Sequence, residues 1–238
     1  MIAHDFIRQM SQACPELRLF GGAAVALTSC WDAVYGRPRE IRDIDVVTTR
    51  TNLRAAIKQL SNIGGHVNKF SLLTSDERLA RGEFQGMHVD IYTDPLYLNQ
   101  KLLIGDRLRL DNYILNSSDL LLTKLQIEER RKLSDIQDVI ALIIDTPLSA
   151  TTDCRAINVG RIAKVCSEAW GFYYSSVHFL TELKNNLNKY QISDKHRIAA
   201  IEKIIIILST IEEYPKPWPW NVRAWFGTAF PHYTKVDP

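Results

Sequence analysis

Two aspartates spaced two positions apart are the residues of this sequence whose types and spacing point most directly to chemistry. Asp43 and Asp45 flank Ile44 in the run Asp-Ile-Asp-Val-Val. On a β-strand, residues i and i+2 point to the same face, so both carboxylates would lie side by side while Ile44 enters the core. Adjacent carboxylates repel each other unless a cation lies between them, and their hard oxygen atoms suit Mg²⁺. The alternative is a solvent-facing strand that happens to be acidic.

A third carboxylate stands in a second alternating run. Asp90 alternates with Val89 and Ile91, which would point to the opposite face of a strand. If this strand lies beside the first, Asp90 joins the same site, and His88 and Tyr92 could share its face. Three carboxylates can hold two metal ions, one lowering the pKa of an attacking hydroxyl and the other binding a triphosphate leaving group.

A Gly-Gly pair precedes the aspartates. Gly21 and Gly22 separate a predicted strand over residues 17–20 from a predicted helix over residues 23–29. Glycine permits a tight turn, and the free N–H groups at a helix start can bind phosphate. An ordinary turn is the alternative, and the position of the pair ahead of the aspartates favours phosphate binding.

The order of these motifs resembles the DNA polymerase β type nucleotidyltransferase superfamily, which shares a Gly-Gly or Gly-Ser turn, an acidic pair and a third carboxylate. Several runs are similar to the AbiE-type toxin nucleotidyltransferases of bacterial abortive-infection systems. They are Gly-Gly-Ala-Ala-Val-Ala-Leu, Arg39 ahead of Asp43, the run over residues 116–125 with Lys124, and the acidic run over residues 135–138. The AbiE-type pattern usually has Ser or Thr two residues before the first catalytic Asp, where this chain has Ile41. The segment between Gly22 and Asp43 is also longer than in minimal members of the family.

This resemblance, over roughly residues 17–145, implies a nucleotidyltransferase that moves a nucleoside monophosphate from an NTP such as ATP to an acceptor hydroxyl. Asp43 and Asp45 would bind two Mg²⁺ ions, Asp90 would bind the ion that activates the nucleophile, and Gly21-Gly22 would position the triphosphate. It also implies a tRNA end as acceptor and an antitoxin protein as partner. The alternatives are a small-molecule nucleotidyltransferase of the antibiotic-modifying kind and a catalytically weak nucleotide-binding or interaction module.

Three cations are candidates for nucleotide binding. Lys124 could reach the nucleotide phosphates from its helix, or it could be a surface lysine whose stem covers apolar residues. Arg39 and Arg42 could contact the triphosphate, or they could balance the charge of the acidic cluster.

Two further carboxylates stand three positions apart on a predicted helix. Asp135 and Asp138 match an acidic helix motif of the AbiE-type group, which implies a supporting role at the site. They could equally pair with Arg131 or Lys132 on the helix surface.

The elements that must position these residues divide the chain into a first half of mixed strands and helices and a helical second half. Strands are predicted over residues 17–20, 44–48, 79–84 and 87–92, with Gln85-Gly86 as a hairpin turn, and helices over residues 51–63, 117–132 and 134–145. Beyond a Ser- and Thr-rich stretch over residues 148–153, helices are predicted over residues 159–169, 173–188, 195–213 and 220–229. The wide apolar arc of residues 195–213 predicts a helix central to a bundle.

The predicted fold class is therefore α+β. We expect a catalytic domain over residues 1–147, with a mixed sheet of the nucleotidyltransferase fold and flanking helices, and an all-α helical bundle over residues 154–238.

Composition limits the class of protein. With 46% hydrophobic and 24% charged residues among 238, the chain is a folded protein rather than a disordered or fibrous one. Its four cysteines show no Cys-x-x-Cys spacing and no two histidines stand four apart, so neither a disulfide framework nor a zinc site is expected. The start lacks a signal-peptide layout and the apolar runs are too short for a bilayer, so we expect a cytoplasmic protein without membrane contact. The net charge of +2 arises in residues 146–238, which permits an RNA partner there.

Overall fold

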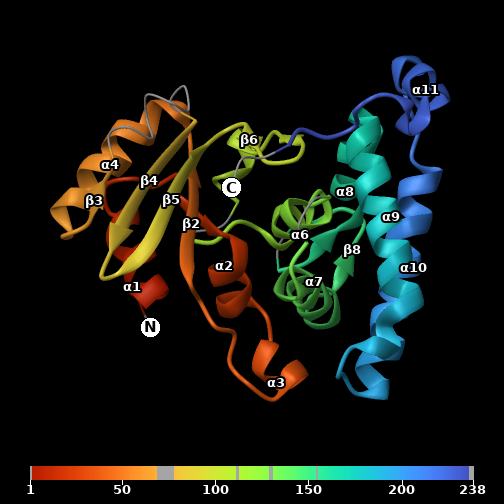
Figure 1. Ribbon diagram of the computed structural model, residues 1–238, viewed down its shortest axis with the longest axis horizontal. Coiled ribbons are helices and arrows are strands. Elements are labelled where there is room, and N and C mark those ends of the chain that lie inside the picture. The colour runs from red at the N-terminus through yellow and green to blue at the C-terminus, as the bar shows by residue number, and fades with distance from the viewer. Residues whose placement is uncertain (1, 69–77, 111–112, 129–130, 154, 236–238) are drawn as a thin grey trace. The chain divides into compact units, whose positions relative to one another are not determined.

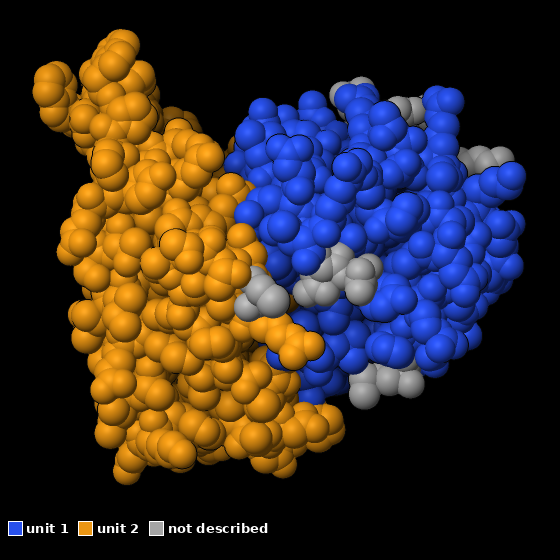
Figure 2. All heavy atoms as spheres, turned by 180° about the vertical axis from the view of Figure 1, so that it is seen from behind, with its two compact units in different colours: residues 1–28, 39–97, 101–116 blue, residues 29–38, 98–100, 117–238 orange. Residues whose placement is uncertain are grey.

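A computed structural model describes residues 2–68, 78–110, 113–128, 131–153 and 155–235. The chain forms two compact units (Figure 2). Unit 1 comprises residues 1–28, 39–97 and 101–116, and unit 2 comprises residues 29–38, 98–100 and 117–238. The carboxylates Asp43, Asp45 and Asp90 belong to unit 1, whereas Lys124 belongs to unit 2.

Unit 1 is built on a mixed sheet, as predicted (Figure 1). The strand order is β1-β2-β5-β4-β3, in which β2 and β5 run parallel and the other neighbours run antiparallel. The strands are β1 (Arg18–Phe20), β2 (Asp43–Thr48), β3 (His66–Val67), β4 (Leu79–Phe84) and β5 (Met87–Thr93).

Alternation of apolar and polar residues explains the two central strands. In β2, Ile44 and Val46 are fully buried while Asp43 is exposed, and in β5 Val89 and Ile91 are fully buried. One face of each strand therefore enters the core, and the other carries Asp43, Asp45 and Asp90, with the buried Val47 at the far end of β2. β4 and β5 are joined at Gln85-Gly86, where both residues have positive φ as a type I′ hairpin turn requires.

Helices complete unit 1. They are α1 (Ile2–Ser11), α2 (Gly21–Thr28) and α4 (Leu53–Asn62), with the 3-10 turns η1 (Arg50–Asn52) and η2 (Gly105–Arg107) and the short hairpin β6 (Leu96–Tyr97) and β7 (Lys101–Leu102). α1 was not predicted from the sequence, and its Phe6 packs against Phe84 of the sheet with ring centroids 5.2 Å apart. α2 begins at Gly21, two residues earlier than predicted.

Unit 2 is mainly helical. It contains α3 (Trp31–Tyr35), α6 (Ser117–Leu125), α7 (Leu133–Asp145), α8 (Val159–Glu168), α9 (Trp170–Asn186), α10 (Asp194–Glu213) and α11 (Trp218–Trp225), with the 3-10 turns η3 (Leu187–Lys189) and η4 (Gly227–Ala229). α10 packs on α7, α8 and α9. In the described part of the chain, no helix has both the length and the apolar character needed to cross a bilayer.

Unit 2 differs from the sequence predictions in three respects. α6 ends at Leu125 rather than near Lys132. The Ser- and Thr-rich stretch contains β8 (Leu148–Ser149), which pairs in parallel with β9 (Ile157–Asn158), so a small sheet accompanies the helices. Because α6 and α7 pack with α8, α9 and α10, the compact units divide at residues 116–117, ahead of the expected boundary.

The expectation that α10 is central to a bundle was wrong. Ile204, Ile207 and Ile211 are buried, but Ile198 and Ile205 on the other side of the helix are 59% and 49% exposed. The wide apolar arc had indicated a helix with neighbours on most sides. Only one side of that arc packs on the neighbouring helices, and the other side faces outward.

Candidate active site

Strand register brings two of the predicted carboxylates together. β2 and β5 are parallel neighbours, and Asp45 is paired with Asp90 while Asp43 is paired with His88. Residues paired across adjacent strands point to the same face of a sheet, so these side chains share the polar face opposite the core. Asp45 and Asp90 are half-buried, whereas Asp43 is exposed at the start of its strand.

The Gly-Gly turn lies against one of these carboxylates. Phe20 is paired with Asp45, so the chain turns into α2 directly beside it. Gly21 has a φ of 70°, and a Cβ atom added to it would lie 2.3 Å from Oδ2 of Asp45. Gly22 is the half-buried second residue of α2. The turn therefore places a carboxylate at the start of a helix, where the helix dipole favours negative charge.

The environment of Asp90 perturbs its carboxyl group. Burial raises the pKa of its carboxyl group, and the Asp43 carboxylate raises it further. The charges of Arg81 and His88 and a hydrogen bond donated by the Tyr92 hydroxyl lower the pKa of Asp90 without outweighing burial. A half-buried carboxylate that is repelled by a second carboxylate is stabilised in its charged form by any cation held between the two.

Arg81 is a further member of this face and was not among the residues predicted from the sequence. It stands on β4 and is paired with Asp90. The sequence was sufficient to place it. A two-residue turn at Gln85-Gly86 pairs Phe84 with Met87, and each step back along β4 is then matched by one step forward along β5. Counting back from the turn places Arg81 opposite Asp90.

The two predicted arginines bond to the loop before β2. Arg42 donates to Oε2 of Glu40 at 2.8 Å and is largely exposed. Arg39 donates to the backbone oxygen of Glu40 at 2.6 Å. The Glu40 hydrogen bond is the main cause that raises the pKa of Arg42, and the Asp43 charge contributes least. The Glu40 carboxylate favours charge balance in the loop for Arg42, while a triphosphate contact by Arg39 stays a prediction.

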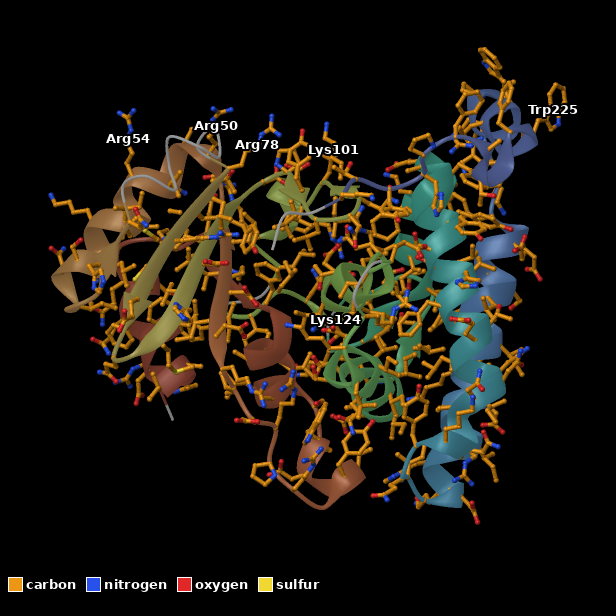
Figure 3. The ribbon with its side chains drawn as sticks, in the orientation of Figure 1. Arg50, Arg54, Arg78, Lys101, Lys124 and Trp225 are labelled. Atoms are coloured by element: carbon orange, nitrogen blue, oxygen red, sulfur yellow. The ribbon has the colours of Figure 1, made fainter. Side chains whose placement is uncertain are left out.

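Lys124 is buried between carboxylates of unit 2, among α6 and α7 (Figure 3). Its Nζ lies 2.7 Å from Oδ1 of Asp135 and 2.9 Å from Oδ2 of Asp138, and Asp138 is fully buried. Burial would lower the pKa of Lys124, but the charges of Asp138 and Asp135 outweigh it and raise the pKa. The idea of a surface lysine was therefore wrong.

The partners of the two helix carboxylates also differ from those expected. Asp135 and Asp138 pair with Lys124 rather than with the side chains of Arg131 or Lys132, although Asp135 accepts a hydrogen bond from the Lys132 backbone. The reason is tertiary, because α7 packs on α6 and turns both carboxylates toward its lysine. The contacts describe a buried ionic cluster that joins the two helices, and a role for Lys124 at a phosphate stays a prediction.

The donor atoms on the polar face of β2 and β5 are of the right chemistry for Mg²⁺. Asp43, Asp45 and Asp90 offer carboxylate oxygens, and the glycine at position 21 leaves room for one of them against the helix start. Within the described ranges, no three His, Cys, Asp or Glu side chains are already gathered as a group that could hold a metal ion. The fit therefore rests on the type of donor, the shared face and the perturbed pKa of Asp90.

No protein-family model matches this chain, and no curated protein matches it either.

Proposed function

We propose that this chain is a nucleotidyltransferase that moves a nucleoside monophosphate from an NTP to an acceptor hydroxyl. The observation that carries the proposal is the pairing of Asp45 with Asp90 on adjacent parallel strands, with Oδ2 of Asp45 against Gly21. A Gly-Gly turn and three carboxylates in this order also constitute the resemblance to the polymerase β type superfamily.

The proposed roles combine this geometry with what the resemblance implies. Asp43, Asp45 and Asp90 would hold two Mg²⁺ ions, which when bound lower the pKa of the acceptor hydroxyl and neutralise the triphosphate. Gly21 and Gly22, at the start of α2, would position the triphosphate, as the resemblance implies. The acceptor oxygen forms a bond to the α-phosphorus, the bond to the β-phosphate breaks, pyrophosphate leaves, and the hydroxyl proton passes to solvent.

Arg81 and Tyr92 are proposed to position Asp90. The Tyr92 hydroxyl donates a hydrogen bond to its carboxylate, and the Arg81 charge favours the ionised form that a metal ion requires. Both would therefore affect transfer through Asp90 and not by contact with the substrate.

For the acceptor, we propose an RNA hydroxyl, a tRNA end among the candidates, with an antitoxin protein as a regulator. The positive excess in residues 146–238 supports an anionic partner. A small hydroxylated molecule is the alternative acceptor.

The test is incubation with each α-labelled NTP, Mg²⁺, and either total RNA or a panel of small hydroxylated compounds. Label in the RNA pool is the expected result. Label in a small compound would show that the acceptor is a small molecule and not RNA, and the proposed reaction would stand. Asp45→Asn should abolish transfer, whereas Asp106→Asn, which alters an exposed carboxylate of unit 1, should leave it unchanged. Label in neither pool, with wild type equal to Asp45→Asn, would overturn the proposal.

A further inference from the structure

The outer face of α10 is apolar without being covered by unit 2. Ile198, Ile205 and Ile206 are 59%, 49% and 46% exposed, and Ile201 and Leu208 are partly exposed. Ile198, Ile201, Ile205 and Leu208 follow one another at spacings of three and four residues, which places them in one stripe along the helix. We call these four residues the α10 stripe, and Ile206 is exposed beside it.

The α10 stripe is not needed to hold the helix in place. Ala200, Ile204, Ile207 and Ile211 are buried on the opposite side, where α10 packs on α7, α8 and α9. Lys203 adds a polar anchor, because its Nζ donates to the backbone oxygens of Ile143, Ile144 and Thr146. Contiguous exposed apolar residues beside a complete packing face are typical of an interaction surface.

The charges beside the stripe indicate what covers it. Lys195 lies near the start of α10 and Glu213 at its end, and both are exposed. Their separation of 18 residues is about five helical turns, so they point in the same direction and flank the stripe on the same side. A twofold axis across the helix centre sets each end of α10 against the opposite end in a second copy. Lys195 of one copy then faces Glu213 of the other, twice.

We propose that the α10 stripe is a self-association surface on which two copies of this chain pair antiparallel through α10. An isologous interface needs a surface that complements itself, and a stripe with a cation at one end and an anion at the other meets that condition. Nucleic acid is disfavoured as occupant, because the stripe is apolar and the exposed Glu202, Glu212 and Glu213 lie on α10 beside it.

The dimer is weak and concentration-dependent. α10 spans 20 residues, about 30 Å, and the stripe occupies only its middle. A standard interface buries about 800 Å² on each partner, and a stripe on one helix offers less, so the Kd is expected on the order of 10 to 100 µM.

Sedimentation velocity of the full chain, from low to several hundred micromolar, tests the proposal. Wild type is expected to pass from monomer to dimer over this range. The double variant Ile198→Lys, Ile205→Lys should remain monomeric with an unchanged circular dichroism spectrum and Tm, because both side chains are exposed. Trp225→Ala is the matched control, since this side chain of α11 is 84% exposed and points away from the other helices (Figure 3). It should dimerise like wild type.

A charge-reversal series distinguishes this interface from any other. Lys195→Glu and Glu213→Lys should each weaken the dimer, on the order of tenfold in Kd, because each substitution occurs twice in a symmetric pair. The combined variant should restore it. A chain that stays monomeric throughout, a dimer lost on Trp225→Ala but kept in the stripe variant, or no restoration on combining the reversals would each overturn the proposal.

Discussion

Oδ2 of Asp45 occupies the space that a side chain at position 21 would need. A Cβ atom on Gly21 would lie 2.3 Å from this oxygen, well inside van der Waals contact. Two motifs 24 positions apart in the sequence therefore depend on each other, since the carboxylate can take this position only while residue 21 is glycine.

Replacing Gly21 by alanine should damage both fold and activity. The positive φ alone should cost about 1 to 2 kcal/mol in an L-residue, and displacement of Asp45 should add to that cost. Gly36→Ala is the matched control, because Gly36 has a φ of 67° with no atom within 4 Å of an added Cβ. We expect urea denaturation to show a larger loss for Gly21→Ala, with transfer lowered at least about 100-fold in that variant alone. Equal losses in both variants would contradict the contact.

Replacing Asp90 by asparagine should separate activity from stability. Burial raises the pKa of Asp90, so its charge at neutral pH opposes folding and its loss should leave Tm unchanged or higher without Mg²⁺. Transfer should fall at least about 100-fold because a metal ligand is lost. Differential scanning calorimetry and the transfer assay measure the two effects. A lower Tm would show that Asp90 is retained for packing.

Replacing Lys124 by methionine should destabilise the protein strongly. The substitution leaves Asp135 and the fully buried Asp138 without their cation, which typically costs about 3 to 5 kcal/mol. Lys164→Met is the matched control, because Lys164 pairs with Glu168 on the surface of α8 and should cost less than about 0.5 kcal/mol. Chemical denaturation of both variants measures the difference. Equal effects would mean that the cluster does not join α6 and α7.

The same cluster should make stability depend on pH in a defined window. Burial raises the pKa of Asp135, but Lys124 outweighs it and the pKa is lowered, so its contribution is present above about pH 4 and lost as pH falls through the folded pKa. The pKa of Lys124 is raised, so its contribution is complete below about pH 10 and lost as pH rises through the folded pKa. Free energies of unfolding against pH should show these losses in wild type and not in Lys124→Met.

Nucleotide should stabilise the protein only together with Mg²⁺. A ligand that binds the folded state alone raises Tm, by about 2.7 kcal/mol in unfolding free energy at a concentration of 100 Kd. We expect a thermal shift with Mg-NTP that disappears with a chelator and in the Asp43→Ala, Asp45→Ala double variant. A shift that survives in that variant would place the nucleotide elsewhere.

The sequence by itself determined strands β1, β2, β4 and β5, the β4–β5 turn and the face that carries the carboxylates. Alternation at Asp43, Asp45 and Asp90 depends only on the two-residue period of a strand, and the Gln85-Gly86 turn sets the β4–β5 register locally. Because these rules act over a few neighbouring residues, the pattern was sufficient to predict the shared face once β2 and β5 lay side by side.

Only the tertiary structure decided what each of these residues contacts. Nothing near Lys124 indicates that Asp135 and Asp138 enclose it, because that contact depends on how α7 packs on α6. The same holds for the outer side of α10, where the apolar pattern is the same whether or not another helix covers it. Periodicity reports which residues share a face, but burial of that face depends on residues far away in the chain, and so does the contact between Gly21 and Asp45.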